Sequence, residues 1–435
     1  MIAILLQHAE EAAVLWGRRD YAVRAPHYDL KDLETHDGRL AAHLDGLVIG
    51  AEAAADVLWT QFDQFPDAGE AFAAAFHALA SAGRGRFEEV VDRAVAADAE
   101  RDPTEFMPPP EDRGGAGGTG GALRGVASAL GWAEPGLLGG LVADLLASED
   151  AARRTLGIAA CALHRRDPGA ALAAACEADD PGLAARALQA AGELGRADLG
   201  EICSARTKED DPRVAAAAAY AAALLKADGG AALWRLVFRN GSFAAKAAAA
   251  APRLCSEKTA RDQLRTLKEA AAAEPALARR LVQAVGAFGD PVFFPWLLER
   301  CAEPALARVA GEAIARTTGI DLAYDDLDRD PPADFEGGPT DDPADDDVAP
   351  DPDADRPWPD PERLAGRIAV FTPPAAGRLL HGAPVSEAAS ALVSAPQRTR
   401  LAAAFEGAAA RGGALFPCAA PAGRQRALLA SQESG

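Results

Sequence analysis

The stretch Asp180-Pro-Gly-Leu-Ala-Ala-Arg-Ala-Leu-Gln-Ala-Ala-Gly-Glu-Leu-Gly195 decides the fold, because close copies of it recur along the chain. Clear copies begin at three later points and weaker ones at two others: Asp211, Glu274 and Glu303, then Asp150 and Ser242. The spacings between equivalent positions are 31, 31, 32 and 29 residues, counted on Pro181, Pro212, Phe243, Pro275 and Pro304. A period near 30 residues suits two short helices and two turns. The repeat therefore predicts an array of helix pairs.

Each copy also carries the local signals of a helix that starts and stops. An acidic residue followed by proline suits an N-cap and the first helical position, where the missing N–H of proline costs nothing. The first helix is expected to end at Gly195, Asp228 and Gly289 in three of the copies. The second helices are expected to supply the large apolar side chains, within 199–203, 231–238, 264–268 and 292–298. Because no pair buries its apolar face alone, the units should stack. An ordinary alanine-rich bundle would explain the composition but not the aligned starts.

Composition divides the chain into five regions. Alanine is abundant and aromatic residues make up only 6%, which favours closely packed helices over sheets and predicts an all-α fold. One tract carries 15 Asp and one Glu against two Arg, a local net charge of −14. With its eight prolines it should be disordered. The predicted regions are an N-terminal helical region (1–106), a Pro/Gly-rich linker (107–122), the repeat array (123–320), the acidic Pro-rich disordered linker (321–360) and a small C-terminal helical module (361–435) that packs back on the array or on the acidic linker.

Charge and cysteine usage limit the partners and the compartment. The net charge is −21, which disfavours nonspecific binding to phosphate backbones and to anionic lipid, so we expect a protein partner and no nucleic acid. The six cysteines stand singly, as small core residues of a reducing compartment do. The start of the chain does not resemble a signal peptide, and the longest apolar stretch, 215–225, is shorter than the roughly 20 residues that span a bilayer. We therefore expect a cytoplasmic protein without a membrane partner.

Two short motifs match the spelling of cofactor or metal loops but lack their context. Gly115-Ala-Gly-Gly-Thr-Gly120 has the spacing of a dinucleotide-binding loop, yet a proline run precedes it where a strand is needed, so we interpret it as linker. The carboxylates of 345–347 and 351–355 alternate as in calcium loops, but the turning glycine and the closing glutamate are missing. Neither motif predicts a bound group.

The histidines and cysteines likewise predict no catalytic centre. His27, Asp29, His36 and His43 are residue types that zinc accepts, but no two of these histidines have the i, i+4 spacing of a helical pair, and hydrogen-bonded or surface histidines are favoured. Cys161 and His164 are three residues apart on an expected core helix, where packing is favoured over a nucleophile–base dyad. We therefore predict no catalytic residue, no metal and no cofactor.

The repeat pattern is similar to that of a known class of repeat. Gly286-Ala-Phe-Gly-Asp-Pro-Val-Phe-Phe-Pro-Trp-Leu-Leu298 and the acid-Pro-x-Leu-Ala-Arg starts resemble HEAT-like repeats, including those named after phycobilisome lyases, over residues 123–320. This resemblance implies a HEAT-like α-solenoid of stacked helix pairs.

The flanks resemble an uncharacterised bacterial family of HEAT-like proteins. The matching blocks are 8–16, 23–30 and 42–47 near the start and 378–385, 397–401 and 420–425 near the end. That family implies no established activity. Some members lie near type VI secretion genes, which implies an accessory or adaptor role. Aromatic positions of the C-terminal block are eroded here, so no preserved ligand site is expected in it.

The leading functional interpretation is a non-enzymatic scaffold or adaptor that binds a protein partner of unknown identity. Its predicted contact residues are four aromatic residues of the second helices, Trp234, Phe238, Phe293 and Trp296, which equally fit a core role. Trp358 would dock the acidic linker onto the array or onto a partner, or would anchor a local turn.

The rival interpretation is a HEAT-like nucleic-acid-acting enzyme such as a DNA glycosylase. It requires a continuous basic inner groove, and the array offers scattered arginines: Arg186, Arg213, Arg235, Arg239, Arg253, Arg261, Arg265, Arg279, Arg280 and Arg308. A bilin-lyase-like activity has only the name of the repeat behind it.

Overall fold

A computed structural model describes residues 2–81, 83–100, 121–239, 241–333, 335, 337, 351–374 and 377–433. These residues are mostly helical, with 21 α-helices and two pairs of two-residue strands, which confirms the all-α prediction. None of the helices in the described ranges is both long and apolar enough to cross a membrane. The predicted Gly-rich motif at 115–120, and most of the linker around it, lie outside the described residues.

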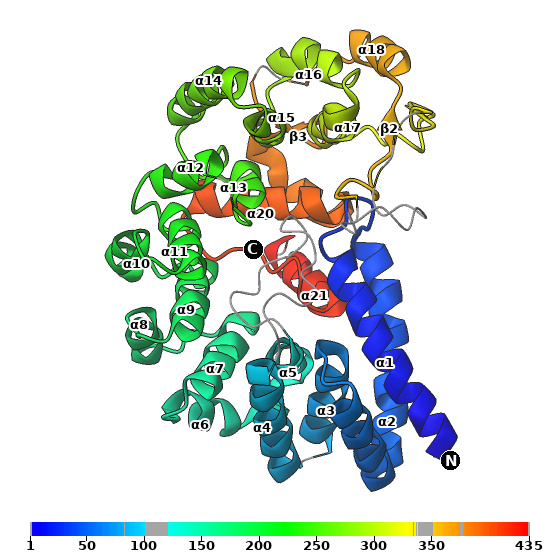
Figure 1. Cartoon of the computed structure of the whole chain (residues 1–435), viewed down its shortest axis with the longest axis vertical. Helices are drawn as coiled ribbons and strands as arrows, with labels where there is room; N and C mark the ends of the chain where they lie inside the picture. Colours follow the sequence, from blue (N-terminus) through cyan, green and yellow to red (C-terminus); the bar gives the residue numbers. More distant parts are fainter. Residues whose placement is uncertain are drawn as a thin grey trace, which may run out of the picture.

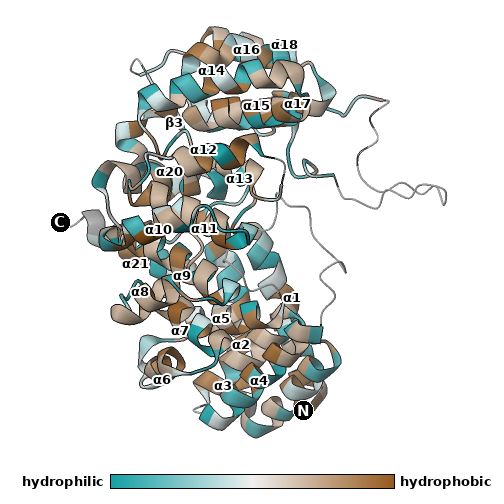
Figure 2. Ribbon diagram, turned by 60° about the vertical axis from the view of Figure 1, so that its left-hand side comes forward, coloured by the Kyte–Doolittle hydropathy of each residue, from teal (hydrophilic) through white to brown (hydrophobic). Residues whose placement is uncertain are grey.

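The N-terminal region contains four helices that gather at one end of the molecule (Figures 1 and 2). Asp29 starts the second of them, since its carboxylate accepts hydrogen bonds from the backbone N–H groups of Lys31 and Asp32. This helix bends at Ala51, whose backbone has a φ of 48°. The helices are α1 (Ile2–Ala22), α2 (Leu30–Gln64), α3 (Ala68–Ala80) and α4 (Arg84–Glu100).

The repeats form two layers of helices. The first helices form the inner layer, in which α5 (Ala122–Trp132) packs on α7, α7 on α9, α9 on α11, α13 on α15 and α15 on α17. The second helices lie outside this layer (Figure 1). The first helices after α5 are α7 (Ala151–Leu163), α9 (Pro181–Leu194), α11 (Pro212–Leu224), α13 (Ala244–Ala250), α15 (Ala276–Phe288) and α17 (Pro304–Thr318). The second helices are α6 (Leu141–Ala147), α8 (Ala170–Cys176), α10 (Gly200–Arg206), α12 (Ala231–Phe238), α14 (Glu257–Ala273) and α16 (Phe294–Arg300).

The helix starts at Asp180, Asp211 and Glu303 agree with the repeat signals, whereas the N-cap of α15 is Pro275 and not Glu274, and one predicted helix end is wrong. Asp180 and Asp211 cap α9 and α11 through their carboxylates, and Gly195 and Gly289 end α9 and α15 in the left-handed conformation. Asp228 does not end α11, which stops at Leu224. Its carboxylate instead accepts hydrogen bonds from two backbone N–H groups at the start of α12. An aspartate before a helix caps the helix that follows, and this role prevails here.

The acidic tract is ordered at both ends, which corrects the prediction of a disordered linker over 321–360. Strand β1 (Asp328–Arg329) pairs antiparallel with β2 (Trp358–Pro359), and Trp358 is only 7% exposed. The physical reason is that aspartates near the second end meet arginines of the array, so their charge is neutralised. The central part of the tract, including Asp345–Asp347, lies outside the described residues.

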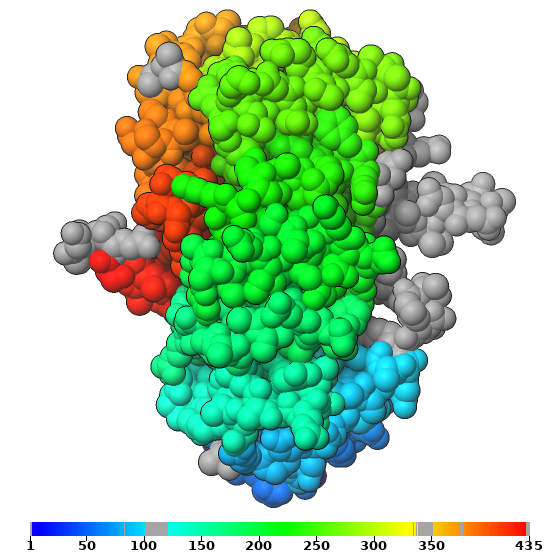
Figure 3. All heavy atoms as spheres, turned by 90° about the vertical axis from the view of Figure 1, so that its left-hand side faces the viewer, coloured from blue at the N-terminus to red at the C-terminus, as the bar shows by residue number. Residues whose placement is uncertain are grey.

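The C-terminal region packs back on the array, as the sequence predicts. It lies along one edge of the array, where the first helices end (Figures 1 and 3). Backbone N–H groups of Leu379, His381 and Leu415 donate to the carbonyl groups of Gly289, Arg316 and Glu193, respectively. The ends of the first helices therefore find hydrogen-bond donors in this segment. Its elements are α18 (Pro361–Ala369), β3 (Leu379–Leu380), β4 (Ala383–Pro384), α19 (Ala391–Ser394), α20 (Gln397–Arg411) and α21 (Ala422–Glu433).

The same segment connects the array to the N-terminal helices. Arg19 of α1 forms an ion pair with Asp37 of α2 and donates to the carbonyl oxygens of Ala419 and Ala420. The backbone N–H of Ala422 donates to Asp37 as well, at 2.7 Å. The C-terminal segment thus joins the first helices of the chain to the last ones of the array.

The close packing of α3 on α5 provides a test of this arrangement. A Cβ atom added to Gly125 would lie 2.0 Å from the carbonyl oxygen of Ala68. We expect Gly125→Ala to lower the free energy of unfolding by about 3 kcal/mol, because the two backbones must separate. Gly17→Ala is the matched control, since nothing lies within 4 Å of its added Cβ on α1. Chemical denaturation would measure the free energy of unfolding of both variants. Equal values for the two variants would contradict this packing.

Candidate functional site

The four predicted contact residues of the second helices do not share one exposed surface. Trp234 is 2% exposed, and its indole N–H donates to the sulfur of Cys255 at 3.5 Å, so it is a core residue. Phe238, Phe293 and Trp296 are partly buried against the same core cluster. Of these, Trp296 stacks under the guanidinium of Arg300. In this conformation Trp234 is not available to a partner, whereas the other three offer only their exposed edges.

Trp358 docks the end of the acidic tract onto the array, one of the alternatives that the sequence left open. Its ring lies 4.7 Å from the guanidinium carbon of Arg308 on α17 and in edge contact with Phe335. Because an arginine over an indole face is an attractive cation–π contact, Trp358 anchors the segment in which it lies.

The residues considered for zinc are not brought together. Asp29 caps α2, His27 packs against Tyr28, and His43 lies 3.1 Å from His8 between their Nδ1 atoms. His36 belongs to neither contact. Within the ranges that the structure describes, no group of three or more His, Cys, Asp or Glu side chains could hold a metal ion.

The cysteines are placed as core residues. None of the six forms a disulfide, and five are buried. Burial raises the pKa of the thiols of Cys176, Cys203 and Cys301 to about 12, so they stay protonated near neutral pH. His164 donates from Nε2 to the carbonyl oxygen of Leu130 at 2.9 Å, and burial lowers its pKa. The ring nitrogen that contacts Leu130 is therefore committed to the backbone.

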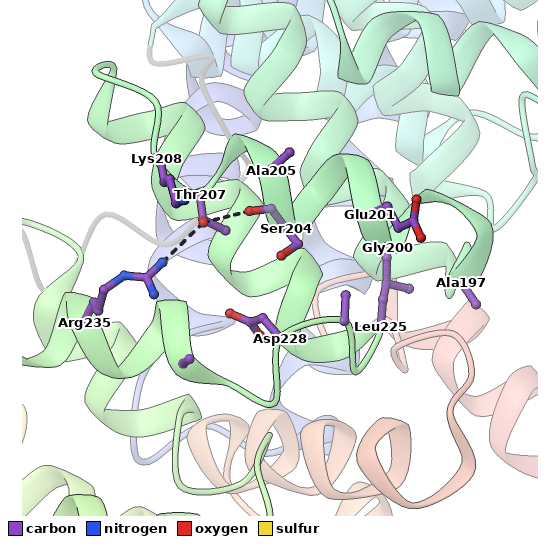
Figure 4. A pocket seen from close by; sticks show the side chains of 12 residues that line it. Ala197, Gly200, Glu201, Ser204, Ala205, Thr207, Lys208, Leu225, Asp228 and Arg235 are labelled. Carbon is purple, nitrogen blue, oxygen red and sulfur yellow. Dashed lines mark hydrogen bonds between the residues drawn. The ribbon is translucent and has the colours of Figure 1, made fainter.

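A surface groove of about 610 Å³ lies between α10 and α12 on the outer layer (Figure 4). Its lining includes small residues such as Gly200, Ala205 and Ala231. Its walls carry both charge signs, and Arg235 donates to the hydroxyl of Thr207 at 3.3 Å. The groove is open and has no buried polar group aimed into it. It has the form of a shallow contact surface rather than of an enclosed substrate site.

A smaller cavity of about 280 Å³ lies between α2, α3 and α4. It is lined in part by Ala51, Trp59 and His77. Burial lowers the pKa of His77, which contacts backbone carbonyl groups at the bend of α2. His77 thus compensates for hydrogen bonds that the bend removes from the helix.

Most of the arginines considered for a nucleic-acid groove are neutralised by carboxylates. Ion pairs involve Arg186, Arg213, Arg253, Arg261, Arg265, Arg279 and Arg308. Arg280 donates to the carbonyl groups of Val237 and Arg239, and Arg235 to Thr207. These arginines therefore have carboxylate, carbonyl or hydroxyl partners within the described part of the chain.

The most developed polar site of the array holds the segment Asp351-Pro-Asp-Ala-Asp355. Asp351 accepts two hydrogen bonds from Arg308, at 2.7 and 2.9 Å. Asp353 accepts two from Arg279 of α15, at 2.7 and 2.5 Å, and also contacts Arg356. Two-pronged contacts of this kind are stronger and more directional than single ones. Alternate aspartates of a segment that forms consecutive turns are therefore each held by an arginine of a successive first helix.

The third aspartate of this segment connects three parts of the chain. Asp355 pairs with Arg398 of α20 at 3.3 Å and accepts from the hydroxyl of Tyr21 on α1 at 3.4 Å. Arg398 also donates to the backbone carbonyl of Arg24, at 2.8 Å. The segment thus lies where the last array helices, the C-terminal module and the first helix meet.

Beside this segment, Glu312 of α17 is surrounded by three arginines. It pairs with Arg316 at 2.6 Å, Arg356 at 2.5 Å and Arg398 at 3.3 Å, and its side chain is 14% exposed. Burial alone would raise the pKa of this carboxyl group, but the charges of Arg356, Arg398 and Arg316 hold it well below its ordinary value of 4.5. Glu312 is therefore ionised and is shared by the array, the acidic tract and α20.

A second buried charge cluster fixes α20 to the middle of the array. The side chain of Arg253 is 0% exposed and pairs with Glu406 of α20 at 2.8 Å. Arg378 contacts the same carboxylate and donates to the carbonyl oxygen of Phe288. Burial lowers the pKa of Arg253 to about 10, which still leaves it charged at neutral pH.

Sequence reasoning missed these arginine–aspartate contacts, although a signal was present. Arg279 and Arg308 occupy the same position of the repeat, the sixth residue from the acid that opens each copy. The aspartates of 351–355 alternate with other residues at a regular spacing. Only the fold shows that the two patterns meet.

Comparison with known proteins does not suggest a family or a function. No family model matches the chain, and neither a curated protein nor a solved structure matches it.

Proposed function

We propose that the chain is a non-enzymatic protein–protein interaction scaffold or adaptor, built over residues 123–320 as a HEAT-like α-solenoid and acting in the cytoplasm. The observation that carries this proposal is that the array already binds a stretch of its own polypeptide, in which Arg279 and Arg308 form ion pairs with alternate aspartates. Layers of paired helices offer long, continuous surfaces for extended partners. The shallow groove between α10 and α12 adds a second contact surface on the outer layer.

The charge distribution supports a protein partner over a nucleic-acid substrate. The net charge of −21 opposes a phosphate backbone, and most arginines that would form a basic groove are occupied by carboxylates. An accessory role beside a contractile injection (type VI secretion) system rests on the resemblance of the flanks alone.

Affinity capture followed by reconstitution tests the proposal. The tagged full chain is incubated with lysate of the source organism, beside an unrelated tagged protein of similar net charge as the control. We expect a defined protein to be retained, and the purified pair to form a complex of fixed stoichiometry by calorimetry. If nucleic acid or a small metabolite is retained reproducibly, and no protein reconstitutes binding, the scaffold proposal is wrong.

A further inference from the structure

We infer that Arg279, Arg308 and Arg398 form a recognition site for an acidic segment of a partner protein that has aspartates at alternate positions and turns as residues 351–355 do, and that residues 351–355 fill this site in cis. The inference rests on the proposed scaffold function and names the chemistry of its partner. Arginine clusters are a recurring means of recognising acidic motifs, because the planar guanidinium matches the carboxylate.

The site prefers carboxylates because its guanidinium groups bind them in pairs. Asp351 and Asp353 each accept two hydrogen bonds from one arginine, at 2.5 to 2.9 Å. The planar fork of arginine matches both oxygens of a carboxylate, which a single-point donor does not. Arg308 also stacks on Trp358 and Phe335 of the acidic tract, so the cis segment adds an aromatic contact to the ionic ones.

The repeat explains why the spacing of the aspartates matters. Arg279 and Arg308 come from equivalent positions of adjacent units, on neighbouring helices α15 and α17. They hold Asp353 and Asp351, respectively, which are two residues apart in a stretch of consecutive turns. Asp355 continues the series to Arg398. A partner segment must therefore carry its carboxylates at this spacing and adopt a similar turn.

The aspartates of the cis segment are held by contacts that another acidic segment could reproduce. The segment is held in addition by the buried Trp358 and Pro359, which form β2 and pair with β1. A tethered segment competes with a free ligand at an effective concentration on the order of millimolar. A partner therefore needs either a tighter acidic motif or additional contacts elsewhere on the scaffold to displace it.

Peptide binding to a chain with a neutralised cis segment tests this inference. The protein is the full chain carrying Asp351→Asn, Asp353→Asn and Asp355→Asn, and the probe is a fluorescent peptide with the sequence of residues 351–360. By fluorescence anisotropy at low salt, we expect this variant to bind the peptide 1:1 and at least about tenfold more tightly than the wild-type chain, whose own segment competes. The matched control peptide carries the same three Asn substitutions and should not bind.

Two further variants keep the outcome decisive. Adding Arg279→Gln and Arg308→Gln to the neutralised chain should abolish binding, whereas adding Lys258→Gln, an 89% exposed lysine of α14, should leave it unchanged. If the triple variant does not unfold cooperatively, the single variant Asp353→Asn, which keeps the Asp351–Arg308 pair, replaces it and should still gain affinity over the wild type.

Three results would overturn the inference. These are equal binding of the acidic and the Asn peptides, no gain in the neutralised chain, and wild-type dimers that neutralisation removes, which would make a second copy of this chain the occupant. Each is distinct from failure of the scaffold proposal. A captured partner that still binds the Arg279→Gln/Arg308→Gln variant would show that the scaffold works through another surface.

Discussion

Glu312→Gln is expected to lower the free energy of unfolding by about 3 kcal/mol. The substitution keeps the shape of the side chain but removes the carboxylate shared by Arg316, Arg356 and Arg398. Three guanidinium groups would then repel one another at a site with little access to water. Chemical denaturation followed by circular dichroism measures the change. Glu299→Gln is the matched control, because this carboxylate is 66% exposed and its pair with Arg300 should contribute less than about 1 kcal/mol.

The contribution of Glu312 should also depend on pH with a definite sign. Its pKa in the folded chain is held below the ordinary value of 4.5, so the stabilisation is fully present above about pH 4.5. It is lost as the pH falls through the lowered pKa. The wild-type chain should therefore lose more stability than Glu312→Gln below pH 4.5. Parallel loss in both chains would show that this carboxylate is not held ionised by its neighbours.

Glu406→Gln is expected to have an effect of similar size, about 3 kcal/mol, and to loosen α20 from the array. The fully buried Arg253 and its neighbour Arg378 would lose the carboxylate that they share. Hydrogen exchange should then rise over residues 378–382, whose backbone bonds to the ends of α15 and α17 depend on this placement. Glu387→Gln, an exposed residue of the same C-terminal segment, is the control. Unchanged exchange in Glu406→Gln would contradict the role of this cluster as the attachment of α20.

The helix pairs were predictable because their signals are local. The acid-Pro starts at Asp180 and Asp211 fix where α9 and α11 begin, and the glycines at 195 and 289 fix where helices end. The prediction that a helix ends at Asp228 was wrong because aspartate occurs both after the end of one helix and before the start of the next. Its hydrogen bonds to the start of α12 decide between the two.

The candidate site was not predictable because its contacts join distant parts of the chain. Composition made the acidic tract look disordered, since repulsion among its aspartates dominates when the tract is considered alone. In the fold Asp351 and Asp353 face Arg308 and Arg279, which lie more than 40 residues away in the sequence. For Trp234 the sequence left a contact role and a core role equally open, and the structure places this side chain in the core between units.

The measurement that tests the central claim most directly is hydrogen exchange of the wild-type full chain, with and without an excess of the peptide of residues 351–360. The claim is that the array is a scaffold whose arginines bind an acidic segment of a partner in place of residues 351–355 of the same chain. We predict faster hydrogen exchange within residues 353–360 of the chain when the acidic peptide exceeds the effective concentration of the tethered segment, which is on the order of millimolar, and no change with the Asn-substituted peptide at the same concentration. Unchanged exchange at saturating acidic peptide would contradict the claim, because the cis segment would then be a fixed part of the fold.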